Sequence, residues 1–511
     1  MAHDPEDTVM LHDGDEGPQR AQEDEYDEDD EDQEDDRDDI YMQVDPAVAN
    51  ETNDFVDESI LLLHILGKNK TNSKQWVSYV RDLNAHDSKH IILYNWVALS
   101  LVREAYADVA AVAVYNFPKK PSQVYYSKNN LNSSDKVHAN ELADLVRHAA
   151  SSEMPIVGFQ DQYFALMHRN CLPKLKCRVN NLRASLSFRG KPLKDENDKL
   201  VYTPSQGDQL RTLLQNAIDS NAPQPLHQNR PDVTAVKFVK DTNNVFVALL
   251  KVFDSMKVHV ASEETALMLE TLCAHCWMIG MSATLAGLAR DKVGAQDVII
   301  AAGKLGEYFQ GTGYLYILFG DKQTRSSVRS FKLFAVPPMP DRRVELCKNW
   351  FHVIDTVYHR VNGRAIDITK AKLYSQLQTQ VMAYAQFAGP FIRHAEVQLI
   401  EYLMSQNRSP TIIGISKFSC ALCDQWIKAI NDENYRKWKV SGCNGRMYPW
   451  ARDVDAGPLT AAAKAKVKAF VYKEVVKCIK KFIPDGGESP AHPSVLDADP
   501  YADKNPRVTL L

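Results

Sequence analysis

Two short motifs constrain the fold of this chain more than any other feature. His394-Ala395-Glu396 opens a run whose apolar residues recur at helical spacing, and Cys420-Ala421-Leu422-Cys423 opens a second such run. The 23 residues between Glu396 and Cys420 are enough for one helix, a turn and the apolar strand 411–416. This order predicts an α/β arrangement in which the starts of two neighbouring helices converge over one end of a sheet.

The residue types at these helix starts predict a metal site. The positive end of a helix favours anions, so Cys420 and Cys423 are readily held there as thiolates, with Ser419 as the expected N-cap. One imidazole and two thiolates make a three-ligand zinc site whose fourth position is left for water, which then ionises near neutral pH. Glu396 follows the histidine by two residues and points away from the metal, where it can pass a proton from water to a leaving amine.

The motifs resemble those of the cytidine-deaminase superfamily, in which H-x-E precedes P-C-x-x-C. His-Ala-Glu-x-Gln-Leu from residue 394, Ser-Lys-Phe-Ser before Cys420, and Ser-Gly-Cys-Asn-Gly-Arg-Met-Tyr-Pro-Trp over 441–450 are similar to the fungal-type branch of predicted nucleic-acid deaminases. The resemblance covers about residues 390–452. Ser419 replaces the usual proline, and Asn444 stands where a histidine is expected.

The resemblance implies a set of roles and a fold. His394, Cys420 and Cys423 would bind Zn²⁺, and Glu396 would be the catalytic proton shuttle. The fold would be a cytidine-deaminase-like mixed sheet flanked by helices. Members of the superfamily place a β-hairpin directly before the H-x-E helix, but residues 342–388 have a helical pattern. The hairpin must therefore come from 109–127 or from 314–336, and we expect the first because its residues are more strongly β-branched and aromatic.

Other residues could form competing sites. Cys443 could close a purely structural zinc site as a fourth ligand, but we interpret it as a buried strand thiol. Cys273 and Cys276 lie in the middle of an apolar helical run, which favours a buried helix over a second metal site. His138-Ala139-Asn140-Glu141 echoes the first motif without a matching C-x-x-C, and we interpret it as an ordinary exposed helix start.

The chain as a whole predicts a large, mainly helical N-terminal elaboration of the α/β domain. Helical patterns occupy 207–219, 233–257, 263–289, 295–310, 342–358 and 370–386, and strands are expected at 314–319 and 330–336. Residues 152–205 show little periodicity. The predicted regions are an acidic tail (1–45), a mainly helical region that supplies the hairpin (46–310), a deaminase-like catalytic domain (311–482) and a flexible C-terminal tail (483–511).

Charge is distributed unevenly along the chain. Residues 1–45 contain 21 Asp and Glu against two Arg, whereas the other residues contain 58 Lys and Arg against 45 Asp and Glu. An acidic block of this kind cannot bury apolar surface, which predicts disorder. It could act as a solubilising tail or cover a basic substrate groove in competition with nucleic acid.

These observations predict a zinc-dependent hydrolytic deaminase that acts on a nucleobase within single-stranded nucleic acid. Two alternatives remain open: an enzyme for a free nucleoside or nucleotide, and an inactive zinc-stabilised interaction module. The first residues lack a secretory signal, and the nine cysteines are too few for a disulfide framework. Residues 271–289 have no charge but contain polar residues, which favours a core helix over a membrane span. An intracellular location, in the cytoplasm or nucleus and without membrane association, is therefore expected.

Overall fold

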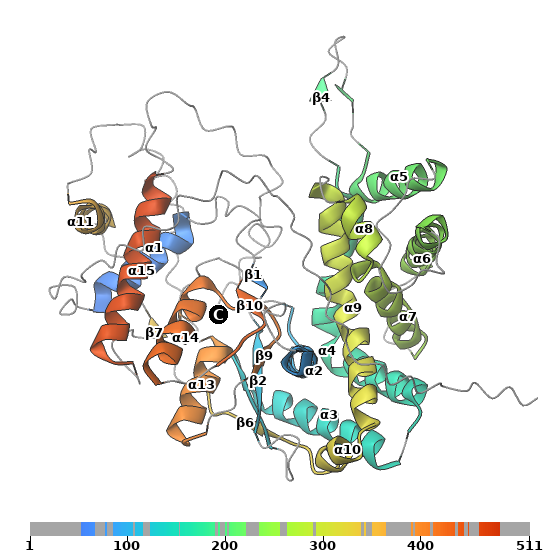
Figure 1. Ribbon diagram of the computed structural model, residues 1–511, viewed down its shortest axis with the longest axis horizontal. Helices are drawn as coiled ribbons and strands as arrows, with labels where there is room; N and C mark the ends of the chain where they lie inside the picture. The colour runs from blue at the N-terminus through green and yellow to red at the C-terminus, as the bar shows by residue number, and fades with distance from the viewer. Residues whose placement is uncertain are drawn as a thin grey trace, which may run out of the picture. The chain divides into compact units, whose positions relative to one another are not determined.

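The chain divides into two units, Met1–Val44 and Asp45–Leu511. The computed structural model describes part of the second unit (Figure 1). The described residues are 53–66, 77–78, 85–105, 108–115, 123–152, 154–189, 193–194, 200–201, 204–220, 235–255, 263–289, 293–338, 342–343, 350–363, 390–391, 394–408, 412–434, 438–443, 448 and 459–480. The predicted acidic tail, the helix at 370–386 and the C-terminal tail lie outside these ranges, and the predicted domain boundaries stay predictions.

A small mixed sheet of four strands lies at the centre of the described fold. Its order is β6-β3-β2-β9, from β2 (Ala110–Tyr115), β3 (Gln123–Lys128), β6 (Lys332–Ala335) and β9 (Ile413–Ile415). Strand β2 is antiparallel to both β3 and β9, with Val112 opposite Tyr126 on one side and Gly414 on the other. Strand β3 is parallel to β6. The predicted hairpin at 109–127 is thus confirmed as the pair next to β9, and the strand expected at 330–336 is confirmed as β6.

The alternation of side chains along these strands supplies two hydrophobic cores, one on each face of the sheet. One face packs against α2 (Ala85–Ser100), and the other packs against α13 (Ala395–Ser405) and the helices beyond it. Ala110, Val112, Val124 and Tyr126 join the first core, whereas Ala111, Ala113, Tyr125, Ile413 and Ile415 join the second. A Cβ atom at Gly414 would lie 2.2 Å from the carbonyl carbon of Tyr94, so glycine is what lets α2 approach β9 this closely.

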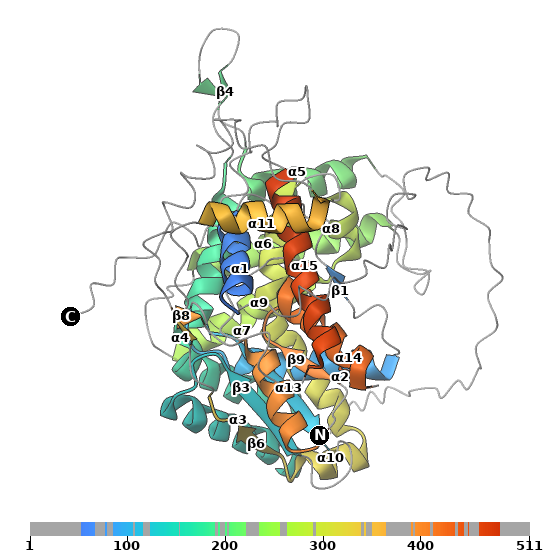
Figure 2. The same cartoon turned by 90° about the vertical axis from the view of Figure 1, so that its left-hand side faces the viewer.

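The second core is completed by helices from both ends of the described sequence (Figure 2). Helix α15 packs against α1, α11 and α14. Two short strand pairs are also present among the described residues: β1 pairs with β10, and β7 pairs with β8, both antiparallel. The bounds are α1 (Asn53–Leu66), α11 (Trp350–Asn362), α14 (Ala421–Asn434), α15 (Ala461–Lys480), β1 (Val77–Ser78), β7 (Arg342–Arg343), β8 (Pro390–Phe391) and β10 (Gly442–Cys443).

A large helical region lies between β3 and β6 in the sequence, as predicted for the elaboration. It contains α3 (Ser133–Ser152), α4 (Ile156–Ser187), α5 (Gln206–Asp219), α6 (Ala235–Ser255), α7 (Glu263–Gly280), α8 (Ala283–Leu288), α9 (Val293–Phe319), α10 (Lys322–Val328) and the strand pair β4 (Leu193–Lys194) and β5 (Leu200–Val201). Helices α7 and α9 approach closely through glycines, because a Cβ on Gly280 would lie 2.5 Å from the Cα of Gly303. None of the described helices is long and apolar enough to cross a membrane.

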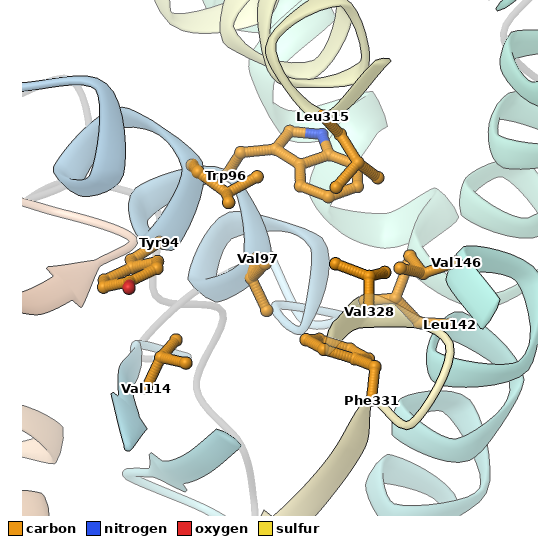
Figure 3. Close-up of a pocket in the computed structure, with 10 residues that line it drawn as sticks. Tyr94, Trp96, Val97, Val114, Leu142, Val146, Leu315, Val328 and Phe331 are labelled. Carbon is orange, nitrogen blue, oxygen red and sulfur yellow. The ribbon is translucent and has the colours of Figure 1, made fainter. Parts of the chain in front are cut away.

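A small apolar cavity lies where α2 meets α3, α9 and α10 (Figure 3). Tyr94, Val97, Val146, Val328 and Phe331 are among the side chains that line it. The atoms that these side chains present to the cavity are apolar, so a water molecule there would find no hydrogen-bond partner, and we interpret the cavity as a packing defect of the first core.

Three sequence predictions about local structure are wrong. The helix expected at 342–358 begins at Trp350 as α11, whereas Arg342 and Arg343 form β7 and pair with β8. The strand expected at 314–319 is the end of α9, where Leu315 and Phe319 are buried one helical turn apart. The stretch 152–205 contains the long helix α4, which bends at Cys171 beside Pro173. Proline removes a backbone donor and kinks a helix. Gln160 and Lys174 also occupy buried positions of α4, so polar residues interrupt the apolar pattern in the sequence.

Candidate metal centre

Three predicted ligands meet at one point between α13 and α14. The Nδ1 atom of His394 lies 3.0 Å from Sγ of Cys423 and 3.5 Å from Sγ of Cys420. The three ligand atoms all lie within 4.8 Å of one another, and in the described part of the chain they form the one such group of three or more His, Cys, Asp or Glu residues. Both sulfurs are buried, and His394 is half-buried.

The two helix starts bring these atoms together. His394 is the N-cap residue of α13, and α14 begins at Ala421, immediately after Cys420. The backbone N–H of Cys423 donates to Sγ of Cys420 at 3.4 Å, so this sulfur performs the N-cap role. The prediction that Ser419 caps α14 is therefore wrong. Ser419 lies one residue too early, and its buried Oγ has no hydrogen-bond partner within the described residues.

The pKa values of the two cysteine thiols shift in opposite directions. Burial opposes ionisation of Cys420, but the hydrogen bond from Cys423 and the charge of the His394 ring outweigh it, and the pKa of Cys420 falls well below its ordinary value. Burial and the negative charge on Cys420 raise the pKa of Cys423 well above its ordinary value. Zinc binds cysteines as thiolates, so its binding here would displace the proton that the raised pKa favours on Cys423.

Glu396 is buried beside the three ligands and does not belong to their group. Its side chain is 4% exposed, and it interacts with the Cys423 thiol through a side-chain hydrogen bond. Burial raises the pKa of Glu396 above its ordinary value. A carboxyl group with a raised pKa exchanges a proton more readily near neutral pH, which is the property a general acid–base requires.

The donor set fits a zinc ion. In a tetrahedral site with Zn–S and Zn–N bonds of about 2.3 and 2.0 Å, neighbouring ligand atoms are roughly 3.5 Å apart. The two nitrogen–sulfur distances of 3.0 and 3.5 Å are already close to this separation. Two thiolates with one imidazole are also the soft and borderline ligands that zinc prefers over magnesium or calcium. Three ligands leave one tetrahedral position for a reactant.

An aromatic side chain borders the site. The ring of Tyr448 meets that of His394 edge to face, with 6.4 Å between the ring centroids. Tyr448 belongs to the motif over 441–450 that resembles the fungal-type branch. Asn444 and Trp450, which the sequence comparison also singled out, lie outside the described residues.

The competing sites do not form. Cys443 is buried in β10 and lies outside the ligand group, as predicted. Cys273 and Cys276 are fully buried within α7, also as predicted. His138, however, was expected at an exposed helix start and is 1% exposed in α3, where its Nε2 lies 2.7 Å from the Ser100 carbonyl oxygen and 3.4 Å from Sγ of Cys171.

Two polar contacts that the sequence did not predict hold α13 in place. The Oγ of Ser127, at the end of β3, donates to the carbonyl oxygen of Ala395. The Nε2 of Gln398 donates to the carbonyl oxygen of Pro337 at 3.0 Å, which gives a structural role to the glutamine of the His-Ala-Glu-x-Gln motif. In the sequence, Ser127 stands out only as a small polar residue at the end of a strand. That feature does not reveal which residue its hydroxyl group contacts.

Comparison with known proteins supports a deaminase assignment for this segment. Residues 393–452 match the family described as OTT_1508_deam:-like deaminase. No curated protein and no solved structure matches the chain. The matched segment contains His394, Glu396, Cys420, Cys423 and Tyr448, which are the residues that the structure gathers at the site.

Proposed function

We propose that this protein is a zinc-dependent hydrolytic deaminase that acts on a nucleobase, with single-stranded nucleic acid as its substrate class. The observation that carries the proposal is the buried carboxyl group of Glu396 beside the group formed by His394, Cys420 and Cys423, within the segment that matches a deaminase family. The arrangement of the sheet and its two ligand-bearing helices is compatible with a cytidine-deaminase-like fold.

The residues divide the chemistry between them. His394 Nδ1 and the sulfurs of Cys420 and Cys423 would hold the zinc ion. When bound, zinc lowers the pKa of a coordinated water to about 7 and so supplies the nucleophile. The Glu396 carboxylate would accept a proton from the attacking water and deliver it to the exocyclic nitrogen, which leaves as ammonia. The buried position of Glu396 excludes bulk water and keeps this proton on the reaction path.

Charge supports a polynucleotide over a free nucleoside. Outside residues 1–45 the chain has 58 Lys and Arg against 45 Asp and Glu, a basic balance that suits a phosphate backbone. Helix α15 carries four exposed lysines opposite its buried apolar stripe. These lysines are Lys466, Lys473, Lys477 and Lys480. A duplex would hide the reacting amine, so the base must be unpaired or flipped to enter the site.

The experiment that tests the proposal combines metal analysis with a substrate panel. The full chain is incubated with single-stranded DNA, single-stranded RNA, cytidine and adenosine, and ammonia release and sequence changes are measured. We expect about one zinc per chain and deamination of an oligonucleotide. The variant Glu396→Gln should retain the zinc and lose the activity, because it keeps the shape of the side chain and removes the proton carrier.

Three results would contradict parts of the proposal. Turnover of free nucleosides without turnover of oligonucleotides would assign a nucleoside deaminase. Zinc with no activity on any member of the panel would favour a zinc-stabilised interaction module. Equal activity in Glu396→Gln and the parent protein would remove Glu396 from the reaction.

A further inference from the structure

One buried hydroxyl group joins the sheet to the helix that carries the candidate site. Ser127 is fully buried, and its Oγ donates to the carbonyl oxygen of Ala395. Ala395 is the first residue of α13 and lies between the ligand His394 and the acid Glu396. Ala395 connects these two residues. A contact that fixes the Ala395 peptide therefore also fixes the directions in which the His394 and Glu396 side chains point.

The contact is informative because apolar packing dominates the rest of this interface, and the other polar contact, from Gln398 to Pro337, lies about one helical turn further along α13. On the face of α13 that carries Ala395, Leu399 is fully buried and the ring of Tyr402 meets that of Tyr125 in β3, with 6.1 Å between the ring centroids. Apolar burial is non-directional, so it holds the helix against the sheet without specifying its rotation. A hydrogen bond requires defined positions of both partners, and the Ser127–Ala395 contact therefore sets the rotation of the first turn.

The position of Ser127 is itself fixed by its neighbour. Lys128 is 1% exposed, and its Nζ lies 2.6 Å from Oδ1 of Asp135 and 3.1 Å from Oδ2 of Asp108. Asp108 precedes β2 and Asp135 lies in the first turn of α3. Lys128 therefore links the end of β3 to the segment before β2 and to the helix after β3. The hydroxyl that contacts α13 thus extends from a rigid part of the fold.

We propose that Ser127 is a positioning residue for the metal centre: its hydroxyl sets the rotation of α13 and thereby places His394 Nδ1 and the Glu396 carboxyl relative to the two cysteines. The expected loss of activity rests on the proposed function, whereas the expected change in ligand geometry requires only that the site binds a metal. Small displacements matter at such a site, since a misplacement of about 1 Å can lower a rate by about 100-fold.

The test compares two buried serines that make the same kind of contact. Ser100 is also fully buried and donates to the carbonyl oxygen of Trp96 at 2.8 Å, but it lies in α2 and does not contact α13. Ser127→Ala removes one buried hydrogen bond, with an expected loss of about 1 kcal/mol. Ser100→Ala removes two, because Ser100 Oγ also pairs with the hydroxyl of Tyr163 at 2.8 Å, so this control should lose at least as much stability without touching α13. Ser127→Cys keeps the size of the side chain with a weaker donor and serves as the conservative variant.

Two readouts are measured on the full-length proteins. The first is the absorption spectrum with Co²⁺ in place of zinc, whose thiolate-to-metal and d–d bands report the ligand geometry. The second is kcat and KM on the substrate identified for the parent protein. We expect Ser127→Ala to bind about one metal per chain with shifted cobalt bands, and to lose at least about tenfold in kcat with little change in KM. Ser127→Cys should lie between it and the parent, and Ser100→Ala should match the parent in both readouts.

The outcomes separate this inference from the proposed function. Identical cobalt spectra for Ser127→Ala, Ser100→Ala and the parent would overturn the positioning role. A parent protein that binds cobalt but deaminates no substrate would overturn the proposed function, and the spectra alone would then decide the role of Ser127. A parent protein that binds neither Co²⁺ nor Zn²⁺ would overturn both.

Discussion

The backbone N–H of Cys423 donates to the sulfur of Cys420 at 3.4 Å, so a candidate metal ligand is also the N-cap of its own helix. A helix start leaves several N–H groups without partners, and a side-chain acceptor there stabilises the helix. The same sulfur lies 3.5 Å from His394 Nδ1. Local folding and metal binding therefore use one atom, which ties the geometry of the site to the start of α14.

Substitutions of Cys420 should separate these two uses. Serine is among the best N-cap residues, whereas alanine cannot cap, so metal-free Cys420→Ser should exceed Cys420→Ala in stability by about 1 kcal/mol. Both variants should lose zinc, because neither supplies a thiolate. Urea unfolding of the metal-free proteins and metal analysis after reloading would measure the two effects. Equal stability of the variants would contradict the capping role, and full zinc content in either would exclude Cys420 as a ligand.

The buried ion cluster at the end of β3 predicts a large effect on stability. Lys128→Met would leave the carboxylates of Asp108 and Asp135 buried without their shared cation. Removal of one partner from a buried ion pair typically costs about 3–5 kcal/mol. We therefore expect a marked fall in the free energy of unfolding, measured by urea denaturation.

An exposed ion pair supplies the matched control. Arg147 pairs with Asp144 on the surface of α3, where the two side chains are 35% and 64% exposed. Exposed pairs contribute about 0–1 kcal/mol, so Arg147→Met should change stability little. A similar loss of unfolding free energy in both variants would show that burial does not increase the contribution of Lys128 to stability.

Much of the candidate site could be predicted because its signals are local. His394 and Glu396 are two residues apart, Cys420 and Cys423 are three apart, and each pair opens a helix. The hairpin at 109–127 could also be predicted, since a β-branched and aromatic composition is a local property. The exact cap was missed because a shift of one residue at a helix start exchanges Ser419 for Cys420.

The features that escaped prediction depend on contacts between distant parts of the sequence. Ser127 and Ala395 are 268 residues apart, and no periodicity links them. The end of α9 was mistaken for a strand because an apolar aromatic run suits either state, and packing against α7 decides in favour of the helix. In α4, a proline and two buried polar residues, Gln160 and Lys174, interrupt the apolar pattern by which a helix is recognised.

A buried lysine predicts a pH dependence of stability. Lys174 is 5% exposed and its Nζ donates to the carbonyl oxygen of Ala105 at 3.3 Å. Burial, with help from the charges of Lys417 and Arg178, lowers the pKa of Lys174 to about 7. The unfolded chain then binds more protons at this residue between about pH 7 and pH 10.5, so this residue makes stability rise with pH across that window.

The variant Lys174→Met should remove this contribution. The difference in unfolding free energy between variant and parent should be largest near pH 7 and should shrink toward pH 10, by up to about 1.4 kcal/mol per pH unit. Urea denaturation at several pH values would measure it, with Lys136→Met as a control at an exposed position of α3. A difference that does not vary with pH would mean that Lys174 is protonated in the folded protein throughout the range.

The acidic segment predicts a salt-dependent competition with nucleic acid. Residues 1–45 contain 21 Asp and Glu against two Arg, so they oppose the basic balance of the other residues. If this segment competes for the surface that binds phosphates, its removal should tighten the binding of a single-stranded oligonucleotide, most strongly at low salt. Fluorescence anisotropy across a salt series would measure Kd for the full chain and the truncated chain. A full-length variant with Asn and Gln in place of these acids separates charge from length: it should bind as tightly as the truncated chain, and equal Kd values for all three proteins at every salt concentration would exclude competition.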